Sequence, residues 1–404
     1  MTAGSWKALI GLFVLTMGTS IITPLLPLYQ QHFGLSTGTL TLLFVTYTVT
    51  VVPTMLVAGN LSDRLGRKRL MLPSMAVLTL ASLVFALSDS VPLLFVGRVL
   101  QGLGIGGFLG VGVAFVVDHA RTASKALAAT LGGVFFRIGF GLGPGMAGII
   151  AHYSADPRHR PFEVHVVLMV LGMVAVALAG ETVVRRRGEP FRIRVGVPEG
   201  QMRGFLTFLA PATFMMSFLE GTLLSLVPIY VVRTLNVHNL VLIGLIGFLI
   251  LGAGAATPFL VRGVDPRRSV MIGVAVSSVE SLLVVGASQV GTVALVVAAA
   301  AAIGFTNGFI LMGGTVICGT IVPLEERGKL LSVLYMCAYA GTLPVVGLGY
   351  LSVAIGLTAT LAVFSAIALL LAAFVLLVGR RLFVAVVPYR PPIAAAEAPA
   401  PASG

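Results

Sequence analysis

The chain has 404 residues, of which 57% are hydrophobic and only 10% are charged, whereas soluble proteins carry about 25% Asp, Glu, Lys and Arg. This shortage of charge excludes a soluble globular enzyme. Lys and Arg exceed Asp and Glu by 12, which in a soluble protein would suggest a nucleic-acid partner. Here the mean hydropathy is +1.05 and apolar stretches of about 20 residues recur, so the composition predicts a helical protein of the lipid bilayer without a nucleic-acid partner.

The first apolar stretch, from Ala8 to about Gln31, exceeds the roughly 7–15 residues of a signal-peptide core, and we expect it to be retained as a helix. The two cysteines, Cys318 and Cys337, both lie inside apolar stretches. They offer no basis for a disulfide framework or a zinc site and are interpreted as packing residues. We therefore expect no metal and no resident cofactor.

Charged and turn-rich breaks divide the chain into twelve predicted spans. The spans run near 8–31, 39–58, 70–88, 92–117, 126–151, 164–184, 205–230, 240–261, 269–287, 291–317, 330–352 and 357–379. The expected fold class is an all-α membrane protein with twelve transmembrane helices in two six-helix bundles. The bundles cover 1–184 and 205–387, with an arginine-rich cytosolic linker at 185–204 and a disordered cytosolic tail at 388–404.

The basic residues set the predicted orientation. With the amino terminus in the cytosol, 21 of the 26 Lys and Arg residues lie on the cytosolic side. Three lie outside (Arg158, Arg160 and Arg233), and two lie within spans (Arg98 and Arg137). The positive-inside rule therefore predicts a multi-pass protein of the cell membrane with both termini in the cytosol, and we expect it to be a monomer.

The two halves of the chain repeat each other at an offset of about 200 residues. Three pairs share this offset: Pro27 with Pro228, Pro144 with Pro344, and Asp63 with Asp265. Repeats in the same orientation imply a pseudo-two-fold axis along the membrane normal and a binding site for a small molecule between the halves, near the middle of the bilayer.

The segment from Gly59 to Arg69 reads GNLSDRLGRKR and is predicted to be a cytosolic loop after the second span. It resembles the signature that the major facilitator superfamily carries between its second and third helices, with every constrained position matched. The resemblance implies a cytosolic gate that latches the two halves. The gate would be formed by Gly59, Asp63, Arg64, Gly66 and Arg67, facing Glu325 and Glu326 of the turn PLEERG. The alternative, a topology signal alone, explains the basic residues but not the glycines and the aspartate together.

In the fourth span, Arg98, Gln101 and Gly102 fit the R-x-x-Q-G pattern that the same family associates with proton coupling. The resemblance thus implies a role for Arg98 in coupling. The alternative is that Arg98, which lies near the outer boundary of its span, snorkels to the membrane surface.

In the fifth span, Gly139, Gly143, Pro144 and Gly148 resemble the glycine and proline signature of superfamily antiporters. Proline removes a backbone hydrogen bond and glycine permits close approach, so this helix can bend against its partner. Packing alone is the alternative, but the placement favours export by exchange.

Ionisable groups inside spans are costly and are therefore candidates for function. Glu220 lies well inside the seventh span, and we predict that it carries a proton while alternately meeting water and Arg98 or Arg137. The alternative is a static pair of Glu220 with an arginine. Glu280, in the middle of the ninth span, is interpreted as a structural or interface residue.

The cavity between the halves is expected to be lined by adaptable apolar, aromatic and amide side chains. The predicted lining residues are Tyr29, Gln101, Met215, Met216, Phe218, Tyr230, Asn307 and Tyr339. Core packing would explain any one of them equally well.

The resemblance covers essentially the whole chain and is strongest to the drug:proton antiporters of the superfamily. It implies that the protein is a transporter and not an enzyme. This transporter would export a small amphipathic or drug-like molecule by alternating access, with protons as the coupling ion. A second hypothesis is a carrier of an anionic metabolite, sugar or lipid-like solute, with Arg98 and Arg137 as anion ligands. A third hypothesis is an intramembrane enzyme or a sensor, but the sequence shows no Ser/His/Asp arrangement that would support catalysis.

Overall fold

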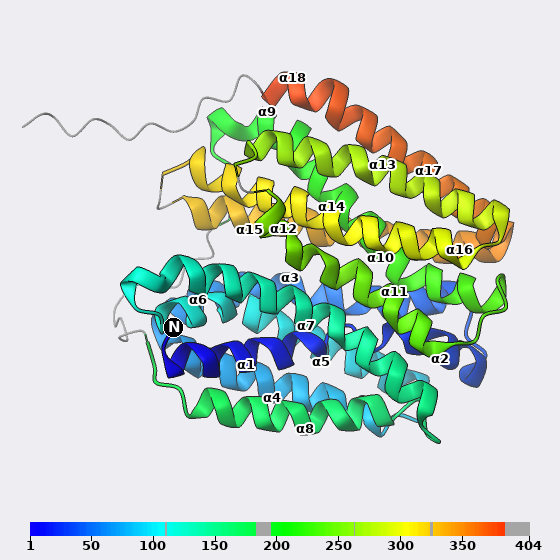
Figure 1. The fold of residues 1–404 in the computed structure, drawn as a ribbon, viewed down its shortest axis with the longest axis horizontal. Helices are drawn as coiled ribbons and strands as arrows, with labels where there is room; N and C mark the ends of the chain where they lie inside the picture. Colours follow the sequence, from blue (N-terminus) through cyan, green and yellow to red (C-terminus); the bar gives the residue numbers. More distant parts are fainter. Residues whose placement is uncertain (110, 183–194, 262, 324–325, 384–404) are drawn as a thin grey trace, which may run out of the picture.

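Residues 1–109, 111–182, 195–261, 263–323 and 326–383 are described in a computed structural model, in which helices run between two faces of the molecule (Figure 1). These residues contain no strand. Helices satisfy their own backbone N–H and C=O groups, which the water-free interior of a bilayer requires. Within the described ranges, eleven helical segments are long and apolar enough to cross a membrane, and the shorter Ala3–Met17 accompanies them. The expected all-α membrane fold is confirmed.

The first half of the chain forms the lower group of helices in Figure 1, drawn from blue to green. Its elements are α1 (Ala3–Met17), η1 (Thr23–Leu25), α2 (Leu26–Phe33), α3 (Thr37–Leu65), α4 (Arg67–Ala86), α5 (Val91–Leu109), α6 (Gly112–Asp118), η2 (Thr122–Ser124), α7 (Lys125–Tyr153) and α8 (Arg160–Ala177).

The second half forms the upper group, drawn from green to red. Its elements are η3 (Glu199–Gln201), α9 (Met202–Gly204), η4 (Phe205–Leu209), α10 (Ala210–Arg233), α11 (Leu240–Gly252), η5 (Ala253–Ala256), α12 (Thr257–Leu260), α13 (Pro266–Val290), α14 (Val293–Thr320), α15 (Arg327–Ala340), α16 (Pro344–Ile355), α17 (Leu357–Ala373), η6 (Phe374–Gly379) and α18 (Arg380–Phe383). Residues 185–194 of the predicted linker and the whole predicted tail lie outside the described residues.

The first span is interrupted, although a single helix from 8 to 31 was expected. α1 ends at Met17, and the chain resumes as η1 and α2, which have Pro24 and Pro27 in their first turns. Proline has no backbone N–H and clashes with the carbonyl four residues earlier, so two prolines in close succession prevent a continuous α-helix here. The carbonyl groups at the end of α1 consequently need other partners.

The segment from 59 to 69 is helical, and the prediction of a loop there was wrong. α3 continues to Leu65 and α4 begins at Arg67, with only Gly66 between them. Gly66 has φ of +109°, a conformation that side chains rarely adopt, so the turn depends on glycine. After α8, the carboxylate of Glu181 accepts hydrogen bonds from the backbone N–H groups of Lys68 (3.4 Å) and Arg69 (3.3 Å), which caps the amino terminus of α4.

The two halves pack against each other near the face opposite the amino terminus. The N-terminal face, on the left of Figure 1, carries the amino terminus and the turn between α3 and α4, while the opposite face carries the ends of α2 and α16. Near the opposite face α7 packs on α11 and α3 packs on α16. A Cβ atom on Gly349 of α16 would lie 1.9 Å from the hydroxyl of Thr41 on α3, so the backbones approach as closely as glycine allows.

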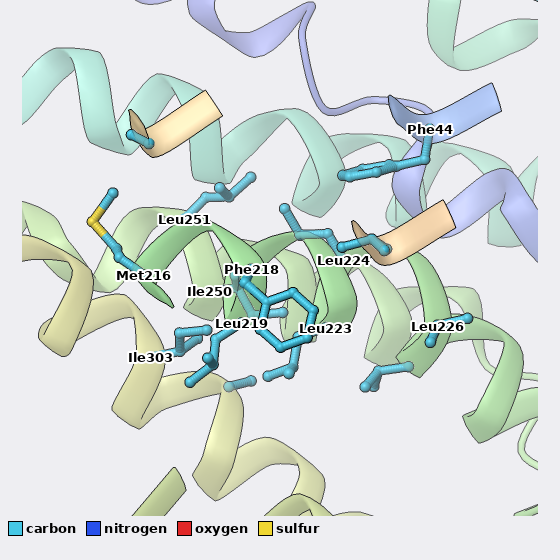
Figure 2. Packing of buried hydrophobic residues seen from close by; sticks show 14 of the residues in the cluster. Phe44, Met216, Phe218, Leu219, Leu223, Leu224, Leu226, Ile250, Leu251 and Ile303 are labelled. Atoms are coloured by element: carbon cyan, nitrogen blue, oxygen red, sulfur yellow. The ribbon is translucent and has the colours of Figure 1, made fainter. Parts of the chain in front are cut away.

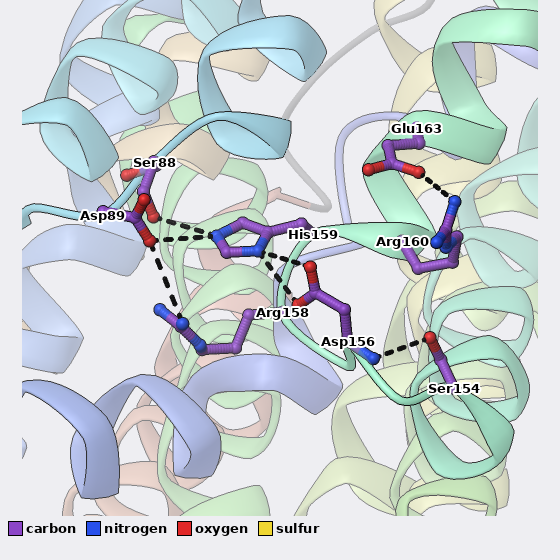
Figure 3. A network of polar contacts seen from close by, with 8 residues as sticks. All are labelled: Ser88, Asp89, Ser154, Asp156, Arg158, His159, Arg160 and Glu163. Carbon is purple, nitrogen blue, oxygen red and sulfur yellow. Dashed lines mark hydrogen bonds and ion pairs between the residues drawn. The ribbon is translucent and has the colours of Figure 1, made fainter.

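A polar network covers part of the opposite face of the first half (Figure 3). The His159 ring lies 2.9 Å from Asp156 and 3.6 Å from Asp89, and so bridges the turn before α8 and the turn after α4. Slight burial alone would raise the pKa of the Asp156 carboxyl, but hydrogen bonds and charge from His159 and the charge of Arg158 hold that pKa below its usual value. The network ties two turns of one half together.

Gly148 is the residue on which the contact between α7 and α11 depends most. A Cβ atom there would lie 2.4 Å from the carbonyl oxygen of Leu240 and 2.9 Å from the Cα of Gly244. Gly148→Val is therefore expected to lower the melting temperature of the purified protein, with an overpacking cost of about 1–3 kcal/mol. Gly145→Val, on the same helix, is the matched control, because a Cβ there comes no nearer than 3.7 Å to Phe248. Equal melting temperatures for the two variants would contradict this role of Gly148.

Candidate functional site

A cavity lies between the two halves, with an empty volume of about 880 Å³ that includes the part open to solvent. Helix α10 contributes much of its wall and is itself central, because 94% of its most apolar window is buried. Figure 2 shows Phe44, Met216, Leu224 and Leu251, which line the cavity, among the buried side chains around α10. The polar lining residues are Tyr47, Arg137, Ser217, Glu220, Asn307, Tyr335, Tyr339 and Thr342.

Glu220 stands at the centre of the polar groups. It is half-buried, and its Oε2 accepts a hydrogen bond of 2.7 Å from Nδ2 of Asn307 on α14. Arg137 of α7, in the other half, interacts electrostatically with Glu220. Gly254 of η5 leaves room for this arginine, since a Cβ there would lie 2.7 Å from its Nη1. The cavity thus brings one acid, one base and one amide together across the boundary between the halves.

Arg98 is fully buried and does not line this cavity. Its Nε donates to the carbonyl of Leu43 at 3.0 Å, its Nη2 donates to the carbonyl of Phe44, and its guanidinium lies 4.3 Å from the ring centre of Tyr47. The arginine therefore binds the backbone of α3 through charge-assisted hydrogen bonds and a cation–π contact. Because Arg98 is buried, its side chain does not snorkel to the membrane surface. Arg98 and Arg137 were both predicted as partners of Glu220, and of these two Arg137 lies at the cavity.

Arg98 and Gln101 also supply partners for the interrupted first span. Arg98 Nη1 donates to Gln101 Oε1 at 2.8 Å and to the carbonyl of Thr19 at 3.4 Å. Gln101 Nε2 donates to the carbonyl of Gly18 at 2.8 Å. These carbonyls lie just beyond the end of α1, where the helix can no longer supply donors. Two residues of the R-x-x-Q-G pattern thus hold the broken helix in place.

His165 of α8 holds the same break from the other side, and the sequence analysis did not single it out. Its Nε2 lies 3.1 Å from the carbonyl of Val14, and its Nδ1 lies 2.8 Å from Oγ of Ser82. A carbonyl only accepts, so Nε2 carries the proton and Nδ1 accepts from the serine. The signal available in the sequence was a histidine inside an apolar span, and in the structure that side chain is fully buried.

The predicted cavity residues divide into two groups. Met216, Asn307 and Tyr339 line the cavity, whereas Tyr29, Gln101, Met215, Phe218 and Tyr230 do not. Phe218 instead packs on Phe364, and Tyr230 donates to the carbonyl of Ala287 at 3.1 Å. The reason is helical periodicity, because the α10 residues on the cavity are 216, 217, 220, 221 and 224, while 215 and 218 point to the other side.

Several lining residues were missed although a simple signal existed. Residues three or four positions from an accepted site residue share its helix face. That rule would have found Leu224 from Glu220, Phe140 from Arg137, and Tyr335 from Tyr339. Tyr47 could not be found by this rule, because no site residue was predicted three or four positions away from it on α3.

The predicted gate residues lie at the N-terminal face. Gly59 and Arg64 are part of α3, and Arg67 at the start of α4 contacts Asp118 at 3.3 Å and donates to the hydroxyl of Ser62. On the other half, Glu326 pairs with Lys329 at 3.0 Å. The side chain of Asp63 and the whole of Glu325 lie outside the described residues.

The residues of the glycine and proline signature place α7 between two partners. Cβ atoms on Gly139 and Gly143 would lie 2.1 Å from the Thr16 hydroxyl and 2.2 Å from the Met17 carbonyl, so both glycines face the end of α1. Gly148 faces α11, as described above. Pro144 cannot donate to the carbonyl of Phe140, and the hydroxyl of Ser20 donates to it instead at 2.6 Å. The hydrogen bond from Ser20 thereby ties α7, at its proline, to the interrupted first span.

Sequence comparisons match the chain to known proteins. Residues 8–262 match the sequence profile described as Major Facilitator Superfamily. A segment of 126 residues is 29% identical to the Bacillibactin exporter of Bacillus subtilis (strain 168), covering 30% of this chain and 31% of that protein. Another, of 173 residues, is 29% identical to a Salmonella paratyphi B protein whose name describes it as multidrug resistance protein MdtD, covering 42% and 36%. The matches thus span about a third of the length of these relatives.

Solved structures share the fold at low sequence identity. The peptide transporter POT in complex with sulfate has a TM-score of 0.79 and 14% identity, covering 95% of this chain and 95% of that chain. A POT family transporter in complex with 5-aminolevulinic acid has a TM-score of 0.77 and 12% identity, covering 94% and 96%. At this identity the likeness shows the fold alone.

Proposed function

Because this chain belongs to the major facilitator superfamily, a family of membrane transporters and not of enzymes, we propose that it exports a small amphipathic molecule in exchange for protons. The observation that carries the proposal is Glu220, which lies in the cavity between the halves with Asn307 on one side and Arg137 on the other. A lone carboxyl at this depth in a bilayer is a default candidate for proton transport.

The cavity wall supports an amphipathic substrate. Aromatic and aliphatic side chains from both halves offer an adaptable apolar surface, and tyrosine hydroxyls offer a few fixed polar contacts. Asn307 Oδ1 is buried and has no hydrogen-bond partner among the described residues, so it can accept a hydrogen bond from a bound molecule. The printed names of the relatives, an exporter and a multidrug resistance protein, support the direction of transport.

The distribution of charge supports the orientation. Most basic residues of the described ranges lie in elements at the N-terminal face, which the positive-inside rule places in the cytosol of a multi-pass cell-membrane protein. The halves pack together near the opposite face, and Thr342 donates to Thr48 between them at 3.2 Å. With this orientation, the contact between the halves near the opposite face supports a cavity that receives its substrate from the cytosol.

The exchange follows from what surrounds Glu220 in each state. While the cavity faces the cytosol, Glu220 accepts a hydrogen bond from Asn307 and is attracted by Arg137, and we propose that its proton leaves as substrate enters. When the halves rock and the cavity faces outside, the carboxylate meets water of higher acidity, takes up a proton, and substrate is released. Protons are thus the coupling ion, and the monomer is the transporting unit.

The carrier of an anionic solute is the weaker candidate. That hypothesis requires Arg98 and Arg137 as anion ligands. The guanidinium of Arg98, however, is buried and donates hydrogen bonds to backbone carbonyls and to Gln101. Among the described residues that line the cavity, Arg137 is the only basic one, and the carboxylate of Glu220 close to it would repel an anion.

Transport in liposomes tests the proposal. The full-length protein is reconstituted, an acidic interior is imposed, and uptake of ethidium or bacillibactin is followed by fluorescence. Uptake is expected to require the pH gradient and to stop when nigericin dissipates it. Uptake that is indifferent to the gradient would contradict proton exchange, and gradient-driven uptake of citrate with no uptake of either probe would favour the anion carrier.

A further inference from the structure

Glu280 is a buried carboxyl that the proposed transport does not use. It lies in α13, has no exposed surface, and is not among the residues that line the cavity. Among the described residues, its Oε1 has no hydrogen-bond partner, and no Lys or Arg lies within 4.0 Å of the carboxyl. An unpaired carboxylate in such a place is strongly unfavourable, so the geometry favours the neutral acid.

The contact of Glu280 with Thr306 of α14 is complete only when the acid is neutral. Thr306 Oγ1 lies 3.3 Å from Glu280 Oε2 and 3.0 Å from the carbonyl of Ile303. A hydroxyl has a single proton, so it cannot donate fully to both acceptors. If Oε2 carries a proton, Glu280 donates to Thr306 and Thr306 donates to Ile303, so each hydroxyl proton has one acceptor and only Oε1 is left without a partner among the described residues.

The next residue of α14 contacts the cavity. Asn307 donates to Glu220 at 2.7 Å, while Thr306 contacts Glu280 on the other side. Consecutive residues of an α-helix point about 100° apart, so α14 presents one residue to α13 and the other to α10. A small rotation of α14 about its axis therefore changes both contacts together.

We propose that Glu280 is a positioning residue that, as a neutral acid bonded to Thr306, fixes the rotation of α14 and thereby the hydrogen bond from Asn307 to Glu220. Its effect on transport rests on the function proposed above, but its effect on Glu220 does not. Glu280 is faced by Thr306 of α14, while the hydroxyl of Ser365 on α17 donates to the carbonyl of Ser281, the next residue of α13. The groups that face Glu220 from other helices are Asn307 of α14, Arg137 of α7, Tyr47 of α3, and Tyr335 and Tyr339 of α15.

Labelling of Glu220 by dicyclohexylcarbodiimide, which reacts with protonated carboxyls in apolar surroundings, tests the proposal in the purified full-length protein. The labelled fraction of the Glu220 peptide is measured by mass spectrometry across a pH series. Thr306→Val is expected to move the midpoint of labelling by about one pH unit to higher pH, because a misplaced Asn307 no longer stabilises the carboxylate. Glu280→Gln, which keeps a neutral donor, is expected to leave the midpoint unchanged.

Thr315→Val is the matched control, because Thr315 lies on α14 and makes the same kind of hydrogen bond to a carbonyl three residues earlier, at 2.9 Å. Thr306→Ser restores the hydroxyl and is expected to restore the midpoint, which separates the hydrogen bond from packing. An unshifted midpoint in Thr306→Val, or a shift in Glu280→Gln as large as that in Thr306→Val, would overturn the proposal. A shifted midpoint with an unchanged pH profile of ethidium transport would leave this inference standing and contradict the proton exchange.

Discussion

Glu220→Gln is expected to abolish pH-driven uptake of ethidium while the purified variant still binds the dye. Glutamine has nearly the same shape and can accept the hydrogen bond from Asn307, so the cavity should keep its form. It cannot take up or release a proton, and the exchange therefore loses its driving force. Uptake into liposomes with an acidic interior should fall to the level of protein-free liposomes, and binding is followed separately by ethidium fluorescence.

The matched control for Glu220→Gln is Glu163→Gln. Glu163 is 44% exposed and pairs with Arg160 at 2.6 Å near the opposite face, away from the cavity. Exposed pairs of this kind contribute about 0–1 kcal/mol, so neither folding nor uptake should change. If Glu220→Gln still concentrates ethidium under the gradient, the proton is carried elsewhere and the proposed exchange through Glu220 is wrong.

Arg98→Met is expected to destabilise the protein more than any other single substitution considered. It removes donors to the carbonyls of Leu43, Phe44 and Thr19 and to the side chain of Gln101. These acceptors are buried, and losing a buried charged partner costs about 3 kcal/mol or more. A large fall in the melting temperature in detergent, with a low yield of folded protein, should follow.

Arg160→Met is the comparison for that measurement, because Arg160 is 58% exposed in its surface pair and its loss should change stability by about 0.5 kcal/mol or less. A different outcome is informative. If Arg98→Met melts close to the unsubstituted protein but loses gradient-driven uptake, Arg98 acts in coupling, as the family pattern implies, and its hydrogen bonds to α1 and α3 are of minor energetic weight.

The sequence alone was sufficient for the fold class, because the bilayer imposes its requirement locally. Each span must be apolar over about 20 residues and must bond its own backbone, so composition within a short window reveals it. The same reasoning singled out Glu220 and Arg137, since a charge inside an apolar stretch is visible without knowledge of its neighbours. Asn307 was found in the same way, as an amide side chain inside a predominantly apolar span.

Only the tertiary structure decided which of these groups meet. Arg98 and Arg137 look alike in sequence. Yet Arg98 donates to the carbonyls of Leu43 and Phe44 on α3 and to a carbonyl of the interrupted first span, whereas Arg137 reaches the cavity. Likewise Met216 faces the cavity while Phe218 packs behind it. In a helix that is buried on almost all sides, apolar residues lie all around the axis. The sequence of such a helix therefore has no one-sided apolar pattern that would distinguish the side facing the cavity from the packed side. Which side of the helix faces the cavity is decided by the side chains that pack against it from helices distant in the sequence.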